Sequence, residues 1–252
     1  MDALIHPRIR ERLIGLRRQE GRRRLWVLLA SSGVVVAVVA VVALLHSPLL
    51  RVERVRVAGA RRTSVAAIVQ ASRLDRHPLM LDVDGTAVAR RVEALPWVDR
   101  VRASRDYPGT VRLVVTERTP VALAPANGGT ALVDASGRVL DVVAKPPNGL
   151  PRLVGVPPVG APGSVVSGGT RAALAVASAM PPELVARASE VAVVDGGELE
   201  LHVVPAGVVL FGPAVQVAEK LQAVAIILAR ADLRGLRAID VRVPSAPVLT
   251  RG

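Results

Sequence analysis

The stretch LPWVDRVRASRDYPGTVRLVVTERTPVA, residues 95–122, contains two strand patterns separated by a turn. In its second half, Val111, Leu113 and Val115 alternate with residues of the opposite face, which is the two-residue period of a half-buried strand. The segment YPGT before them, residues 107–110, combines proline and glycine, which favour tight turns. The stretch therefore predicts two strands joined by a turn.

The preceding residues add a third strand and two helices. Residues 52–59, VERVRVAG, place Val55 and Val57 on one face of a strand and Arg54 and Arg56 on the other. Two helices are predicted after it, over residues 64–71 with Thr63 or Ser64 as the cap and over residues 86–94 with Pro96 as the stop. The resulting order of elements is β-α-α-β-β.

Ahead of these elements lies LWVLLASSGVVVAVVAVVALL, residues 25–45, which contains no charged side chain. A helix of this length spans roughly 30 Å, the thickness of the hydrocarbon core of a bilayer. A cleaved signal peptide is the main alternative, but its apolar region is usually about 7–15 residues long and ends in a small-residue cleavage site. We therefore predict an uncleaved transmembrane helix.

Positive charge is concentrated before this helix. Residues 1–24 contain eight arginines and three acidic residues, whereas His46 and Arg51 are the first basic residues after it. The positive-inside rule predicts a single-pass type II protein of the plasma membrane, with a cytoplasmic tail at 1–24 and the rest of the chain outside. Part of the net charge of +12 then reflects topology, and nucleic-acid binding by the tail is the less favoured alternative.

The sequence after residue 122 has the patterns of a β-rich unit. Hairpins are predicted at residues 131–141 and 198–212, strands at 150–155 and 238–244, helices at 171–180 and 213–231, and an exposed loop at 157–169. The predicted fold class is α+β: a transmembrane helix over residues 25–45, a β-α-α-β-β unit over 50–122, and a mixed, β-rich unit over 123–248.

Several motifs occur together along these units. The pattern V-x-x-V-x-V-x-G starts at Val52, L-P-W-V at Leu95 and V-x-E-R-x-P-V-A at Val115. Nearer the end, E-K-L starts at Glu219 and I-D-V-R at Ile239. In this combination the chain resembles the family of the bacterial cell-division protein FtsQ, called DivIB in Gram-positive bacteria. The resemblance implies that residues 50–122 form a POTRA domain and that residues 123–248 form the β-rich FtsQ/DivIB-type domain.

The resemblance also implies a function. Members of this family are non-enzymatic scaffolds of the division machinery, the divisome, at the septum. The POTRA domain is implied to help bring the protein to the division site, and the β-rich domain to bind the small bitopic proteins FtsB (DivIC-like) and FtsL. Through them the scaffold is linked to FtsW, to the septal transpeptidase and to the control of septal peptidoglycan synthesis. No cofactor, nucleic acid or small-molecule substrate is implied.

Two partner-binding surfaces are predicted. The first is the strand around residues 238–243, expected to be a sheet edge that accepts a partner strand, with Ile239, Asp240, Val241, Arg242 and Val243 as its binding residues. On this hypothesis, Val241→Pro abolishes partner capture and leaves the stability of the fold almost unchanged. The prolines that follow, Pro244 and Pro247, depart from the aromatic-rich end common in the family.

The second predicted surface is a basic outer face on the strands of the POTRA domain. Arg54, Arg56 and Arg112 are the residues expected to contact a protein partner or a wall polymer, and Arg100, Arg102 and Arg105 extend the same face. A solvated sheet face without a partner is the alternative interpretation.

No residue pattern indicates catalysis. The chain has no cysteine, no phosphate-binding glycine loop and no serine-nucleophile motif, and its four histidines lie in separate segments, at His6, His46, His77 and His202. Asp82 and Asp84 are expected to mark the entry of a helix, and Glu117 and Arg118 to form an ion pair at a strand end. Three alternatives to a division scaffold remain: a POTRA-type polypeptide chaperone or transport component, an extracytoplasmic cell-wall enzyme, and a membrane-tethered nucleic-acid binder.

Overall fold

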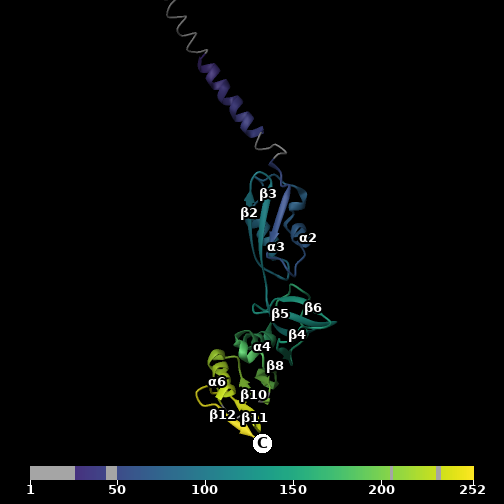
Figure 1. Cartoon of the computed structure of the whole chain (residues 1–252), viewed down its shortest axis with the longest axis vertical. Coiled ribbons are helices and arrows are strands. Elements are labelled where there is room, and N and C mark those ends of the chain that lie inside the picture. The colour runs from purple at the N-terminus through teal and green to yellow at the C-terminus, as the bar shows by residue number, and fades with distance from the viewer. Residues whose placement is uncertain (1–25, 44–49, 205–206, 231–233) are drawn as a thin grey trace, which may run out of the picture.

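The computed structural model describes residues 26–43, 50–204, 207–230 and 234–252 (Figure 1). A helix, a three-stranded unit and a nine-stranded unit follow one another along the molecule. The predicted basic tail, residues 1–24, lies outside the described residues, as does part of the turn of the hairpin predicted at 198–212. The predicted α+β class, with one N-terminal apolar helix ahead of a β-α-α-β-β unit and a mixed, β-rich unit, is confirmed.

The N-terminal helix, Trp26–Ala43, is long and apolar enough to cross a membrane. None of it is buried against the rest of the described chain, and it contains no charged residue. Ser31 donates its hydroxyl hydrogen to the carbonyl of Leu28 at 3.0 Å, so this polar group is satisfied inside the helix, as a lipid environment requires.

The three-stranded unit has the predicted order of elements. These are β1 (Arg54–Ala58), α2 (Val65–Ser72), the short 3-10 turn η2 (Leu74–Arg76), α3 (Gly85–Glu93), β2 (Val98–Asp106) and β3 (Thr110–Glu117). The sheet order is β1-β3-β2, with β3 parallel to β1 and antiparallel to β2.

Both helices of this unit begin at predicted caps. Ser64 accepts a hydrogen bond from the Ala67 N–H at 3.2 Å, and Asp84 accepts one from the Thr86 N–H at 2.9 Å. These bonds satisfy N–H groups that the first turn of a helix leaves without a partner. The helices and one face of the sheet enclose an aliphatic core that includes Ile68, Leu74, Met80, Val88, Val92, Val98, Val111, Leu113 and Val115.

The nine-stranded unit is one mixed sheet. Its strands are β4 (Pro120–Ala126), β5 (Gly129–Asp134), β6 (Val139–Val143), β7 (Arg152–Val154), β8 (Ala188–Val193), β9 (Leu199–Val203), β10 (Gly207–Gly212), β11 (Leu236–Asp240) and β12 (Val248–Arg251). Their order across the sheet is β12-β11-β10-β9-β8-β7-β4-β5-β6. The sheet therefore ends in β6 on one side and in β12 on the other.

The helices α4 (Gly168–Ala179), α5 (Pro182–Val185) and α6 (Val217–Arg230) pack against this sheet. Alternation in β9, where Leu199, Leu201 and Val203 are buried, directs one face of the strands towards the helices. A single cluster of aliphatic side chains joins the helices and strands, and Phe211 is its one aromatic member.

Four elements of this unit have no counterpart in the sequence prediction, the strands β4, β8 and β12 and the helix α5. The helix α5 is a single turn of four residues, too short to show a helical period. The strand β8, ASEVAV, contains alanine and glutamate, which are depleted in strands, and becomes a strand through pairing with β7 and β9.

Candidate docking surfaces

The edge of the nine-stranded sheet next to residues 238–243 is β12, which we call the open edge, and the prediction that residues 238–243 form this edge is wrong. Ile239 of β11 pairs with Val209 of β10 on one side and with Leu249 of β12 on the other. The segment after β11 reverses the chain, with Ala246 donating its N–H to the Val243 carbonyl at 3.1 Å. Pro244 lies inside that reversal, where no ladder hydrogen bond is required of it.

The apolar residues predicted for partner binding lie in different environments. Ile239 and Val241 are fully buried, with 0% of their surface exposed, whereas Val243 is 59% exposed. Val241 also donates its backbone N–H to the Leu210 carbonyl at 3.0 Å. Proline at position 241 would remove that bond and disturb the core, so Val241→Pro cannot separate partner binding from stability.

The charged residues predicted for partner binding, Asp240 and Arg242, form an ion pair at the end of β11. Arg242 donates from Nη2 to Asp240 Oδ2 at 2.6 Å and from Nε to the same oxygen at 3.0 Å. These hydrogen bonds hold the pKa of Asp240 below its ordinary value, so the carboxylate is charged at neutral pH.

A buried lysine lies on α6 near this ion pair. Lys220 is 1% exposed and donates from Nζ to the carbonyls of Phe211 at 2.8 Å and Pro213 at 3.0 Å. Burial lowers the pKa of Lys220, while the charge of Asp240 opposes that shift. The lysine of the E-K-L motif therefore fastens the end of β10 to α6.

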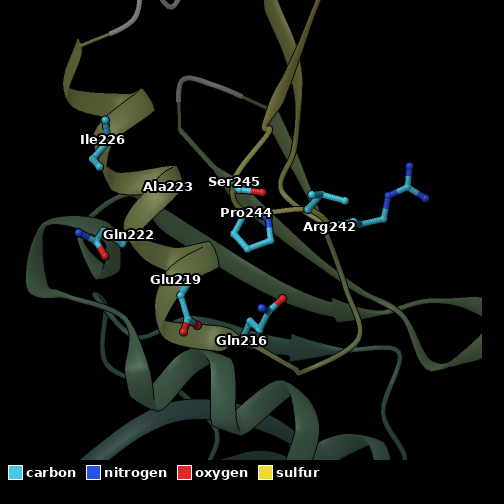
Figure 2. Close-up of a pocket in the computed structure, with 9 residues that line it drawn as sticks. Gln216, Glu219, Gln222, Ala223, Ile226, Arg242, Pro244 and Ser245 are labelled. Carbon is cyan, nitrogen blue, oxygen red and sulfur yellow. The ribbon is translucent and has the colours of Figure 1, made fainter.

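A groove of about 550 Å³ lies between α6 and the segment that follows β11 (Figure 2). Figure 2 shows Arg242 extending away from α6. Ile226 on α6 is 46% exposed, and it and Val243 give the groove apolar surface. The lining residues are Gln216, Glu219, Gln222, Ala223 and Ile226 on one wall and Arg242, Val243, Pro244 and Ser245 on the other.

The outer face of the three-stranded sheet brings together the other predicted arginines. The register places Arg56 beside Arg112, and Arg112 beside Ser104. The arginines on this face are Arg54, Arg56, Arg100, Arg102 and Arg112, and all are exposed. Arg105 pairs with the buried Val111, so it belongs to the opposite face and its predicted place in this group is wrong.

The V-x-E-R-x-P motif lies at the junction between the two units. Glu117 accepts hydrogen bonds from the backbone N–H groups of Arg62 at 2.9 Å and Thr63 at 2.8 Å. Burial alone would raise the pKa of Glu117, but these donors outweigh it and lower the pKa. Glu117 thus closes the loop between β1 and α2, and the predicted ion pair with Arg118 is wrong.

Arg118 instead reaches the next unit. Its Nη1 lies 2.7 Å from Asp134 Oδ2 in β5 and 3.5 Å from Asp99 Oδ1 in β2, and its Nε donates to the Val98 carbonyl at 3.0 Å. Trp97 packs at the same junction against a small cluster formed by Leu123, Leu132 and Leu140. The junction therefore combines an ion pair with apolar contacts.

Sequence reasoning missed β12 and the role of Trp97. The short run VLTR, residues 248–251, follows two prolines and is only four residues long, although its β-branched residues were a usable signal. Within the described ranges, no group of three or more histidine, aspartate or glutamate side chains could hold a metal ion.

A single apolar helix, a β-α-α-β-β unit and a mixed sheet with an open edge define a membrane-attached POTRA protein. Residues 50–118 match the family model described as "POTRA domain, FtsQ-type", and residues 122–242 match "Cell division protein FtsQ/DivIB, C-terminal". The chain belongs to the FtsQ/DivIB family of cell-division proteins.

Curated relatives named "Cell division protein FtsQ" agree with this assignment. The protein of Rhodothermus marinus is 30% identical over 192 residues, covering 75% of this chain and 70% of the relative. That of Mycolicibacterium smegmatis is 30% identical over 229 residues (90% and 66%), and that of Mycobacterium leprae 28% identical over 207 residues (82% and 58%). The chain spans 53–63% of the length of three of the actinobacterial relatives that it matches.

Proposed function

We propose that this protein is a non-enzymatic scaffold of the divisome that acts at the septum. Its tail, residues 1–24, is cytoplasmic in this proposal and both folded units are extracytoplasmic. Family membership supports the division role, and the eight arginines that precede the helix support the orientation. The scaffold holds FtsB-type (DivIC-like) and FtsL-type partners and through them links early division proteins to FtsW, the septal transpeptidase and peptidoglycan synthesis.

The partner site in this proposal is the open side of β12. The observation that carries it is a terminal strand whose four residues are all exposed, with Val248 60% and Leu249 37% accessible. Among the described residues, no strand pairs with its outer side. A partner strand would extend the sheet through main-chain hydrogen bonds and lay neighbouring side chains into the groove beside α6.

The backbone of β12 indicates which residue tests this mode of binding. Gly252 donates its N–H to the Gly235 carbonyl, towards β11. N–H groups alternate in direction along a strand, so the N–H of Leu249 points to the open side. Leu249→Pro removes that donor and leaves the pairing with β11 in place, whereas Leu249→Ala keeps the donor and shortens the side chain.

Capture of an FtsB-type partner from the same source by the full-length chain is the measurement. We expect Leu249→Pro to weaken capture about tenfold more than Leu249→Ala, because proline removes a main-chain donor and its ring obstructs the neighbouring strand. Equal capture by both variants would show that binding does not use strand addition at β12. Thermal unfolding of each variant controls for loss of the fold.

Septal location is tested by a fluorescent fusion at the N-terminus in dividing cells. The proposal expects a band at the septum that is lost when residues 50–118 are deleted. Uniform fluorescence around the membrane of dividing cells would contradict a role for the POTRA domain in recruitment.

A further inference from the structure

The outer face of the three-stranded sheet is separate from the partner site on β12 and has a different chemistry. It presents five arginines, and Asp106 is the acidic residue in register with them, 3.4 Å from Arg112. Asp99 lies in the bulge of β2, where it pairs with Arg118 at 3.5 Å. Asp99 also lies beside Arg100 and Arg102, so five positive charges against two acidic residues leave about +3 on this face.

This composition does not suit a protein partner. The cores of protein interfaces are enriched in aromatic residues, methionine and arginine, and the described strand residues of this face supply arginine without any aromatic residue or methionine. On this face, Val114, 44% exposed, is the only large apolar side chain among the described strand residues that face outward. An anionic surface matches the face better, because guanidinium groups bind phosphate through paired hydrogen bonds.

The face is also held close to the membrane. Met80 donates its N–H to the Leu50 carbonyl at 2.7 Å, and Arg54 donates its N–H to the Gly109 carbonyl at 3.1 Å, so the folded unit begins at Leu50. Six residues, 44–49, lie between it and Ala43, the last residue described in the helix. Even fully extended, this connection reaches about 25 Å.

An exposed tyrosine lies at the same end of the sheet. Tyr107 is 54% exposed in the turn between β2 and β3, and the flanking residues Asp106 and Thr110 are in register with each other. Thr110 is also in register with Arg54, the outer-face arginine nearest in sequence to the helix. Tyrosine favours the membrane interface, because its ring is apolar and its hydroxyl is polar.

We infer that the outer face of the POTRA sheet docks onto anionic lipid headgroups of the membrane that holds the helix. The helix supplies the tether, and the arginines supply the attraction, which salt weakens. The inference does not depend on partner binding at β12, because the two surfaces are on different sheets.

A lipid-borne quencher tests this inference on the full-length chain. The chain contains no cysteine, so Ser104→Cys places one fluorophore on the outer face, and Gln70→Cys places one on α2 as the matched control. Nanodiscs are prepared from phosphatidylcholine alone or mixed with phosphatidylglycerol, each with a nitroxide-headgroup lipid. We expect strong quenching of the Ser104→Cys label only with phosphatidylglycerol, and little quenching of the Gln70→Cys label in either lipid.

Charge variants make the test specific. Each arginine removed should lower the ratio of docked to undocked molecules about fivefold at low salt, so Arg56→Gln with Arg112→Gln should lower it about 25-fold. Arg90→Gln on α3 removes one charge from the helix side of the unit and should change the ratio of docked to undocked molecules little. Circular dichroism confirms that each variant is folded.

Three results would overturn the inference. The first is equal quenching in the two lipid mixtures, and the second is quenching that persists in the Arg56→Gln, Arg112→Gln variant. The third is that lipid never quenches the label at position 104 while purified anionic wall polymer protects it from solvent. That result would assign the face to the polymer. None of these results bears on capture at Leu249.

Discussion

Replacing Arg118 by methionine should loosen the junction between the POTRA unit and the nine-stranded unit. The Oδ2 atom of Asp134 then loses its partner at 2.7 Å. The other oxygen, Oδ1, keeps hydrogen bonds from the backbone N–H groups of Ser136 at 2.9 Å and Arg138 at 2.8 Å. One hydrogen bond to a charged group contributes about 1.5–3 kcal/mol, and a fully orphaned buried charge costs about 3–5 kcal/mol. Because Asp134 keeps other donors, we expect a loss of about 2 kcal/mol.

Tryptophan fluorescence can follow this change at the junction itself. The chain has two tryptophans, so Trp26→Phe leaves Trp97 as the only reporter, and Trp97 packs beside the ion pair. Urea unfolding of the full-length chain in detergent gives the free energy of unfolding. Arg152→Met, which removes an exposed arginine from β7, should leave it within about 0.5 kcal/mol of the parent.

A double-mutant cycle with Asp134→Asn decides whether the reasoning is correct. If the two side chains interact as described, the double variant loses less stability than the sum of the single variants, by roughly 2 kcal/mol. Additivity to within about 0.5 kcal/mol would refute the interaction.

Three further predictions concern the folded units. Gly59→Ala should destabilise the POTRA unit by at least about 2 kcal/mol in thermal melts, because Gly59 has a φ of +87° and an added Cβ would collide with the Val115 carbonyl. The control Gly128→Ala should cost about 1 kcal/mol, because Gly128 has a similar φ of +88° but open space around it. The pKa of Asp134 lies below its ordinary value of 3.8. The charged carboxylate therefore stabilises the fold above that pH, and this stabilisation is lost as the pH falls through the lowered pKa. Melting temperatures measured as the pH is lowered through this range should fall less in Asp134→Asn than in the parent. Ser64→Ala should cost about 1 kcal/mol, seen as faster amide exchange at the start of α2, and exchange equal to that of the parent would show that the cap contributes nothing.

The POTRA unit was predictable because its signals are local. Each strand shows a two-residue period, and each helix has a polar cap at its start, so the order β-α-α-β-β follows from neighbouring residues. The basic outer face follows from the same alternation. Only Arg105 was placed on the wrong face, although it lies three residues after Arg102, so the two-residue period itself puts it on the opposite face.

The end of the chain was harder to predict because its structure depends on pairing. Residues 239–243 have the pattern of a last strand, but whether a strand is an edge depends on whether another segment returns to cover it. The covering strand β12 has four residues, all exposed, so no burial pattern marks it in the sequence. Pro244, one of the prolines that depart from the aromatic-rich end of the family, lies in the reversal that makes β12 possible.

The adjacent positions of Glu117 and Arg118 have a mechanical consequence. Neighbouring residues of an extended chain point to opposite sides. Glu117 therefore fastens the β1–α2 loop of the POTRA unit, and Arg118 reaches into the nine-stranded unit. A pull on a strand held at β12 would then load the Arg118–Asp134 ion pair before it reached the POTRA unit, so this pair resists separation of the two units.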